Sequence, residues 1–251
     1  MSKIITIANQ KGGIAKTTTS LALAIGLKEK GKKTLLVDFD PQCNATDNMR
    51  AETKDRATLY DILCAECDAI EAVQHTELGD IIASDKLLSS ADRRLTDTGY
   101  EYIFSEAIEK LKVDYDYIIL DTPPAFGALM LNALYASDGV IVPINSDRFA
   151  LAGLAELNNT INKVRKYGHK DLKIYGLLLC KYNPRLKKSK MLESSIEDIC
   201  NMLNTKVFST FIRESVEIAN SQITKESPYS KPSNASEDYR KLISELTKEL
   251  E

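Results

Sequence analysis

Residues 11–19 read Lys-Gly-Gly-Ile-Ala-Lys-Thr-Thr-Thr, and this stretch decides the fold of the 251-residue chain. An apolar run that includes Ile4, Ile5 and Ile7 comes before it and predicts a buried strand. Behind it, apolar residues recur at helical spacing between positions 21 and 27. Glycines let a backbone approach an anion closely, and the first amides of a helix point unpaired N–H groups at it. The stretch therefore predicts a phosphate-binding loop between a strand and a helix.

The general phosphate-loop pattern, G-x-x-x-x-G-K-[ST], gives two of these residues a role. Lys16 would reach the β- and γ-phosphates of a nucleotide, and the Thr17 hydroxyl would hold Mg²⁺. The match is partial, since Gln10 and Ala15 stand where the pattern has its two glycines. A positive φ at Ala15 would cost about 1–2 kcal/mol, whereas a negative φ would be harmless. Because Lys16 and Thr17 must already be near-helical, we expect a negative φ at Ala15.

Two further strands are predicted to end in carboxylates. The apolar run at 35–37 leads into Asp38 and Asp40, and the run at 117–120 leads into Asp121. Taken singly, each of these residues fits an ordinary turn at the end of a strand. Parallel strands, however, place their carboxyl ends at one edge of a sheet, where nucleotides bind. Together with the loop, the three carboxylates favour a nucleotide site at that edge.

The alternation of strand and helix patterns predicts the fold class. Strand-like runs recur at 81–83, 117–120, 139–144 and 174–179, and helical patterns separate them. This order indicates an α/β fold with a single doubly wound, mostly parallel sheet and helices on both faces. We expect one domain over residues 1–251, with the polar stretch 227–236 as a loop before a last helix at 237–250.

Ordered motifs along the chain resemble those of a known family. They lie at 9–13, 17–19, 37–46, 121–124, 131–134, 136–138 and 142–144, with a looser match at 236–240. In these motifs the chain resembles the ParA (Soj-like) partition ATPases, a group related to MinD and to the nitrogenase iron protein. The resemblance covers nearly the whole chain and implies a single P-loop NTPase-like ATPase domain. The helix-turn-helix extension of longer plasmid partition ATPases is missing, so we expect no site-specific operator binding.

The resemblance also implies roles for individual residues in binding ATP or ADP with Mg²⁺. Lys11 matches a signature lysine that reaches the other subunit's nucleotide, and Asp40 matches the carboxylate that orients the attacking water. The implied catalytic residues are Lys11, Lys16 and Asp40, with Thr17 and Asp121 as metal ligands. The implied nucleotide-contacting residues are Lys11, Gly12, Gly13, Ile14, Ala15, Lys16, Thr17, Thr18, Asp38 and Asp121. The reaction is hydrolysis of ATP to ADP and phosphate, which positioning and charge neutralisation accelerate.

A basic segment follows the last predicted strand. Residues 181–190 contain five basic residues and no acidic one, although the net charge of the chain is −3. Such a segment can neutralise DNA phosphates without reading sequence, and it is equally typical of a solvated helix entry. The resemblance favours non-specific double-stranded DNA. It points to Arg185 and Arg213, and charge alone adds Lys187, Lys188 and Lys190.

Composition argues against a membrane or secreted protein. No run reaches the roughly 18–20 apolar residues that span a bilayer, and no cleavable leader precedes the first strand. The five cysteines are an odd number and indicate reduced thiols. Cys64 and Cys67 have metal-site spacing, but no second Cys or His pair accompanies them. We expect a cytoplasmic protein that associates with the nucleoid when ATP is bound.

These observations lead to one main hypothesis and three alternatives. In the main one, ATP closes a homodimer on non-specific DNA, and a ParB-type centromere-binding partner stimulates otherwise slow hydrolysis and releases it. A nucleotide-gated binding protein with negligible turnover is the first alternative. A MinD-like positioning ATPase is the second, but the acidic bias of 237–250 is not typical of a membrane-surface helix. A metabolic ATP-dependent ligase is disfavoured because residues 11–13 and 40–42 match the partition group more closely.

Overall fold

Seven strands form one sheet at the centre of the molecule. The structure is a computed structural model that describes residues 2–145, 150–183, 185 and 187–250, without the side chains of 150–152 and 187–194. The strand order is β3-β4-β2-β5-β1-β6-β7. All neighbouring strands pair in parallel except β3 and β4, which are antiparallel. The predicted mostly parallel sheet is confirmed.

The strand that begins the chain lies in the middle of the sheet, between two strands that come much later. The strands are β1 (Lys3–Ile7), β2 (Thr34–Asp38), β3 (Val73–His75), β4 (Asp80–Ile82), β5 (Tyr117–Asp121), β6 (Gly139–Ile144) and β7 (Lys173–Leu179). Every residue of β2, β5 and β6 is buried. Strands read as continuous apolar runs when helices cover both faces of their sheet, as they do here.

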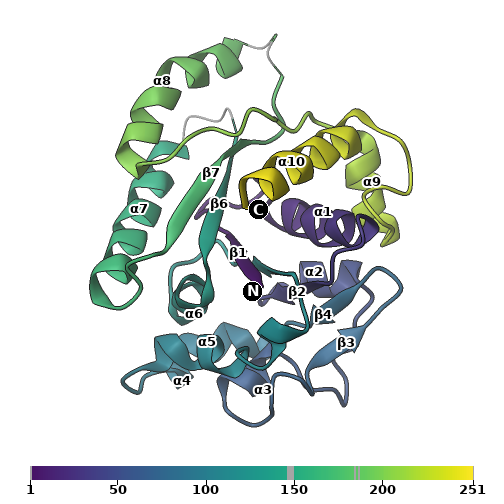
Figure 1. Ribbon diagram of the computed structural model, residues 1–251, viewed down its shortest axis with the longest axis vertical. Coiled ribbons are helices and arrows are strands. Elements are labelled where there is room, and N and C mark those ends of the chain that lie inside the picture. Colours follow the sequence, from purple (N-terminus) through teal and green to yellow (C-terminus); the bar gives the residue numbers. More distant parts are fainter. Residues whose placement is uncertain (1, 146–149, 184, 186, 251) are drawn as a thin grey trace.

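Helices cover both faces, as predicted (Figure 1). They are α1 (Lys16–Glu29), α2 (Asn44–Asn48), α3 (Leu59–Leu63), α4 (Ala91–Arg94), α5 (Ile103–Ala107), α6 (Ala128–Ala136), α7 (Ala150–Tyr167), α8 (Lys187–Leu203), α9 (Val216–Thr224) and α10 (Asn234–Leu250). Short 3₁₀ turns lie at Lys86–Ser90, Tyr100–Tyr102 and Leu111–Val113. Residues Ile5 and Ile7 of β1 point to a core shared with α1 and α10, whereas Ile4 points to the opposite core.

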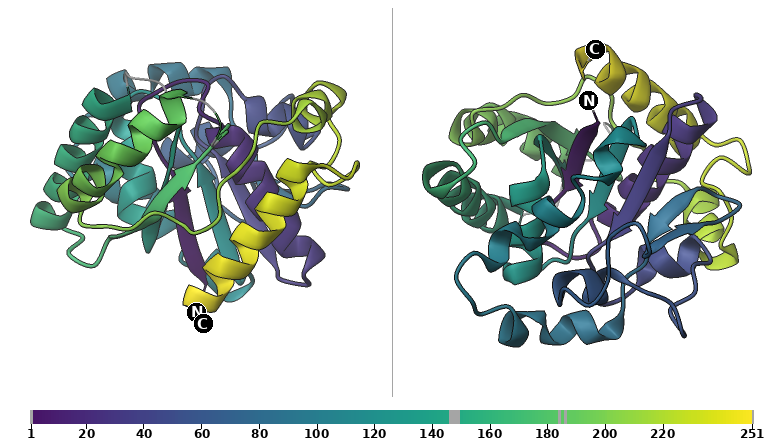
Figure 2. Two further views of the ribbon diagram at one scale, coloured as in Figure 1. Left: turned by 90° about the horizontal axis from the view of Figure 1, so that it is seen from above. Right: turned by 60° about the horizontal axis from the view of Figure 1, so that its bottom comes forward.

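The last helix packs along the first one, beside the phosphate-binding loop. Figure 2 shows α10 running next to α1 in both of its views. Leu242, Ile243 and Leu246 of α10 are fully buried in this core. The prediction that this apolar stripe packs inside the protein is confirmed. Within the described residues, no helix combines the length and apolar character needed to cross a bilayer.

Two details of the fold differ from the sequence prediction. The last helix begins at Asn234 instead of residue 237, because the Ser233 hydroxyl accepts a hydrogen bond from the Ser236 N–H at 3.0 Å and so caps an earlier turn. The short edge strand β3 was not predicted at all. Only three residues long and half-exposed, it has no alternating pattern from which a strand could be predicted.

Candidate nucleotide site

The loop between β1 and α1 has the backbone of an anion cradle. Gly13 and Ala15 both adopt a left-handed conformation, each with φ 73°. Left-handed residues within a turn direct successive N–H groups toward one point, where an anion can bind. The helix then begins at Lys16, so its N-terminal N–H groups and dipole point at the same place.

The expected negative φ at Ala15 is wrong. Ala15 is the N-cap of α1: its carbonyl accepts the first helical hydrogen bond, from the Thr19 N–H at 2.9 Å, but its own φ and ψ are not helical. The helical geometry of Lys16 therefore places no constraint on the residue before it. A Cβ in this conformation costs about 1–2 kcal/mol, and the loop carries that strain.

Two lysines and a buried asparagine fix the loop from inside. The Lys16 ammonium donates to the Lys11 carbonyl at 3.1 Å, and the Lys11 ammonium donates to Asn145 Oδ1 at 3.3 Å. Asn9 is buried, accepts from the Lys11 N–H at 3.1 Å and donates to the Pro143 carbonyl at 2.7 Å. Burial lowers the pKa of Lys16, and the charges of Asp121 and Asp40 oppose this shift. Lys16 is therefore a nearly buried cation close to two carboxylates.

The predicted carboxylates do come together at the carboxyl edge of the sheet. Asp38 and Asp121 are register partners on the neighbouring strands β2 and β5, and both are fully buried. Asp38 accepts hydrogen bonds from the backbone and hydroxyl of Thr46, each at 2.8 Å, and from the Asp40 N–H at 3.0 Å. These contacts hold the segment after β2 close to the loop.

Burial disfavours the charged form of both carboxylates. It raises the pKa of Asp121 to about 8, and the charge of Asp38 adds to the rise. It likewise raises the pKa of Asp38 to about 6, although the hydrogen bonds from Thr46 lower it. A site that holds two carboxylates this deeply calls for a cation, because buried charge is costly unless it is paired.

The oxygen atoms around Asp121 fit Mg²⁺. Asp121 Oδ1 accepts from the Ser20 hydroxyl at 2.9 Å, but its buried Oδ2 has no hydrogen-bond partner within the described residues. The Thr17 hydroxyl also interacts with this carboxylate. Mg²⁺ is usually bound by one or two protein oxygens, with phosphates and waters completing its shell. Thr17 and Asp121 therefore make a suitable pair of ligands, either directly or through water.

A cavity of about 670 Å³ opens over the loop. Among the residues predicted to contact the nucleotide or to take part in hydrolysis, Gly12, Gly13, Ala15, Lys16, Thr17, Thr18 and Asp40 line it, and the predicted DNA-binding residue Arg213 lines it too. Asp38 and Asp121 are buried below these residues, and Ile14 directs its side chain into the core. The far wall consists of residues between 212 and 223 together with Tyr239 of α10. The cavity is thus large enough for a nucleotide.

Three cavity residues that were not predicted as site residues make hydrogen bonds to the loop or to the start of α1. Gln222 of α9 donates to the Thr18 hydroxyl at 2.8 Å, and buried Tyr239 shares a hydrogen bond of 3.1 Å with the Thr19 hydroxyl. Lys181, which the sequence places in the basic segment, donates to the Gly13 carbonyl at 3.0 Å. The polar residues of α9 and the lysine after β7 are far from the loop in sequence, so spacing gave no signal for them.

The residues predicted to bind DNA have different surroundings. Arg185 is exposed on the turn before α8, and its backbone N–H donates to Asn183 Oδ1 at 3.0 Å. The side chains of Lys187, Lys188 and Lys190, in the first turn of α8, lie outside the described residues. The role of these four residues stays a prediction.

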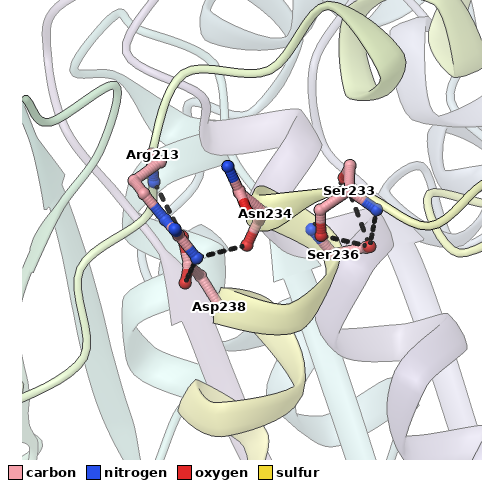
Figure 3. Close-up of polar contacts among 5 residues, drawn as sticks. All are labelled: Arg213, Ser233, Asn234, Ser236 and Asp238. Carbon is pink, nitrogen blue, oxygen red and sulfur yellow. Dashed lines mark hydrogen bonds and ion pairs between the residues drawn. The ribbon is translucent and has the colours of Figure 1, made fainter.

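Arg213 is bound within the protein (Figure 3). Its guanidinium donates to both oxygens of Asp238, at 2.8 and 2.7 Å, and to the Asn234 carbonyl at 3.2 Å. The Asp238 side chain is only 6% exposed, while that of Arg213 is 36% exposed. The predicted DNA contact of Arg213 is not tested by this geometry, but its charge already has a carboxylate partner.

The cysteines give no sign of a metal or redox site. Cys64 and Cys67 are free thiols, and burial raises the pKa of Cys67 to about 11. A thiol with a raised pKa carries little reactive thiolate at neutral pH. No cluster of three or more metal-ligating side chains occurs in the part of the chain that the structure describes.

Known proteins resemble the chain in sequence and in fold. A family model described as "AAA domain" matches residues 2–174. The sporulation initiation inhibitor protein Soj of Bacillus subtilis (strain 168) is 40% identical over 223 residues, which cover 87% of each chain. The chromosome partitioning protein ParA of Caulobacter vibrioides (strain NA1000 / CB15N) is 34% identical over 223 residues, covering 86% of this chain and 82% of that one.

A solved structure supports the same fold. The cobyrinic acid a,c-diamide synthase of Mycobacterium smegmatis, with bound ATP analogue and magnesium, superimposes with a TM-score of 0.89 at 28% identity. The match covers 100% of this chain and 96% of that one. The arrangement of sheet, loop and helices is therefore shared over the full length.

Proposed function

Because the chain belongs to the ParA/Soj family of partition ATPases, we propose that it uses ATP to segregate DNA. The chain is a P-loop ATPase whose ligands are ATP or ADP with Mg²⁺. One observation carries the assignment to this chain's own residues. The buried pair Asp38 and Asp121 lies beside the loop, with one Asp121 oxygen lacking a partner among the described residues.

The proposed roles of the site residues combine their positions in the structure with the roles that the family resemblance implies. The loop N–H groups and the Lys16 ammonium bind the phosphates, and the low dielectric around Lys16 strengthens that attraction. Thr17 and Asp121 hold Mg²⁺, which neutralises charge on the phosphates when it is bound. Asp40 lines the cavity and orients the attacking water. Asp38 accepts a hydrogen bond from the Asp40 N–H and so fixes the segment that contains Asp40. Lys11 reaches the nucleotide of a second copy.

The proposed cycle couples this chemistry to DNA. ATP closes a homodimer, and the dimer binds non-specific double-stranded DNA through Arg185 and the lysines at the start of α8. A ParB-type partner then stimulates hydrolysis, and the dimer releases DNA. The exposed position of Arg185 supports this proposal, since phosphate contacts need accessible cations.

The test is ATP turnover by the purified protein, with and without duplex DNA. We expect slow turnover that falls to background in Lys16→Ala and Asp40→Ala, while Asp40→Ala still binds DNA in the presence of ATP. Asp68→Ala removes an exposed carboxylate that does not line the cavity and serves as the control. Turnover unchanged in Lys16→Ala would contradict the assignment of the site.

DNA binding has its own measurement. Log affinity should fall linearly with log salt concentration, and replacing one cation that contacts a phosphate should reduce the slope by about 0.9. We expect this change for Arg185→Ala, with Lys110→Ala as a control for the loss of an exposed cation elsewhere. An unchanged slope for Arg185→Ala would remove that residue from the proposed DNA surface.

A second candidate function is a nucleotide-gated binding protein with negligible turnover. The strain at Ala15 favours it, because strain shifts the loop toward relaxed conformations in which its N–H groups no longer converge on the phosphates. Intact ATP binding with no turnover, even with DNA and a partner, would support this candidate.

A MinD-like positioning ATPase and a metabolic ligase have less support. The apolar stripe of α10 is buried, so this helix offers no membrane-binding face of the MinD kind. The diamide synthase is 28% identical, whereas the partition relatives are 34–40% identical. A metabolic ligase is therefore less favoured than a partition ATPase.

A further inference from the structure

Lys181 lies at the nucleotide loop, although it belongs to no phosphate-loop motif. It follows β7, and its ammonium donates to the Gly13 carbonyl at 3.0 Å. Its backbone adopts a left-handed conformation with φ 51°. A residue with a Cβ rarely holds this conformation unless its surroundings favour it, and such outliers cluster at functional sites. The unusual turn after β7 accompanies a side chain that reaches the loop.

The contact fixes the direction of one peptide group in the loop. The peptide between Gly13 and Ile14 is trans and planar, so the Gly13 C=O and the Ile14 N–H point in opposite directions. An ammonium that holds the carbonyl therefore turns the Ile14 N–H away from Lys181 and fixes the orientation of this peptide group in the loop. Lys16 acts on the Lys11 carbonyl in a similar way, at 3.1 Å. Two lysines thus fix two carbonyls of the same loop.

The loop of this chain has a particular need for such a contact. Gly13 tolerates its left-handed conformation because it has no Cβ, but Ala15 does not. The strain at Ala15 favours relaxed loop conformations in which the N–H groups no longer converge. A contact made only in the converged conformation shifts the population back toward it.

We propose that Lys181 is a positioning residue of the nucleotide site, holding the Gly13 carbonyl and so keeping the loop in its observed conformation despite the strain at Ala15. The inference rests on the proposed function, because it presupposes that a nucleotide binds in this cavity. Lys181 acts through the loop backbone, and the part of the loop that it fixes serves ADP and ATP equally.

The first experiment is calorimetric titration of the full chain with Mg²⁺-ADP and with a Mg²⁺-bound non-hydrolysable ATP analogue. Lys181→Met keeps the length of the side chain without its charge and should weaken both ligands about tenfold. Lys181→Arg, which retains a cationic donor, should recover most of the affinity. Lys206→Met removes an ammonium paired with Glu249 at 2.7 Å and should bind like the wild type.

A different pattern would overturn the inference. A loss confined to the ATP analogue would mean that the ammonium contacts the γ-phosphate directly instead of positioning the loop. Equal affinities of Lys181→Met and the wild type would also overturn it. If Lys181→Met unfolds at a lower urea concentration than the wild type, Lys181→Gln, which keeps a neutral N–H donor, replaces it in the titration.

The second experiment tests the link to Ala15. In an Ala15→Gly background the loop no longer carries the strain, so Lys181→Met should weaken ADP only about twofold. A purely structural role of Lys181 outside the loop would give the same loss in both backgrounds, and that result would overturn the proposal.

Failure of this inference and failure of the proposed function look different. If the wild type binds ADP no better than Lys16→Ala does, the nucleotide site itself is wrongly assigned. If the wild type binds and Lys16→Ala does not, while Lys181→Met binds like the wild type, only the role of Lys181 is refuted.

Discussion

Ala15 holds the nucleotide loop in a conformation that its own methyl group opposes. Its φ of 73° equals that of Gly13 two positions earlier, so the same backbone geometry is occupied once by glycine and once by alanine. At Gly13 no heavy atom lies within 4 Å of the position that a Cβ would take. A substitution at Gly13 therefore probes backbone strain without a steric clash.

We expect substitutions at Ala15 and Gly13 to change the free energy of unfolding in opposite directions. Ala15→Gly should raise the free energy of unfolding by about 0.5 kcal/mol, because relief of strain exceeds the entropy that glycine adds to the unfolded chain. Gly13→Ala should lower it by about 1 kcal/mol for the converse reason. Urea unfolding of the metal-free protein measures both. Shifts in the same direction would show that strain does not govern this loop.

At the scale of single residues, the sequence predicted the site well where chemistry is carried by a local motif. Lys16, Thr17 and the carboxylates after β2 and β5 come together as expected, because parallel strands bring their carboxyl ends to one edge. Lys181 and Gln222 were missed because their contacts depend on a turn and on a helix position that no spacing encodes.

At the scale of elements, α10 is fixed to the rest of the molecule near its N-terminus. The Arg213 guanidinium and backbone N–H both donate to Asp238 of this helix, and buried Tyr239 hydrogen-bonds to Thr19 of α1. Asp238 and Tyr239 are buried, and Tyr239 lines the cavity, so these contacts hold the helix next to it. The start of α10 is therefore part of the wall of the nucleotide site.

Removal of Arg213 should loosen this helix. Arg213→Ala leaves the buried Asp238 carboxylate without its cation and should lower the free energy of unfolding by about 1–2 kcal/mol, less than for a fully buried pair because Arg213 is partly exposed. Lys110→Ala, in a pair whose side chains are 66% and 65% exposed, should change it by less than about 0.5 kcal/mol. Thermal and urea unfolding measure both variants.

The same variant separates two roles for Arg213. Weaker DNA binding with unchanged stability would favour the contact with DNA that the sequence predicted. Lower stability together with weaker nucleotide binding would favour its role in holding α10 against the cavity.

Elements were predictable from the sequence where they are long and periodic. The buried strands and α1 carry clear patterns, whereas β3 and the early start of α10 depend on an edge pairing and on a serine cap. Such features depend on single contacts and produce no periodic pattern in the sequence, so they could not be predicted from it.

At the scale of the whole molecule, the buried carboxylates make the stability of the metal-free protein depend on pH. The pKa of Asp121 rises from 3.8 to about 8 on folding, so the folded state retains a proton that the unfolded state has lost. The contribution of protonated Asp121 to the free energy of unfolding is fully present below pH 3.8 and is lost as the pH rises through about 8. Asp38, with its pKa raised to about 6, acts in the same direction.

Replacement of Asp121 should remove most of this dependence. In EDTA, Asp121→Asn should exceed the wild type in free energy of unfolding at pH 8.5 by at least about 1 kcal/mol, with a smaller difference at pH 5. Mg²⁺ with ADP should stabilise the wild type by mass action and the variant much less. A wild type that is more stable than Asp121→Asn at pH 8.5 in EDTA would contradict the raised pKa that burial gives this carboxylate.

The central position of β1 has a consequence for how the protein is made on the ribosome. The first strand emerges with both edges unpaired, and the backbone of Ile4 reaches Asp138 only after 134 further positions have been added. Tyr239, which closes the cavity, emerges later still. A nascent chain therefore cannot bind ATP until nearly all of it has left the tunnel. Until then its exposed strand edges invite aggregation and make it a client for chaperones.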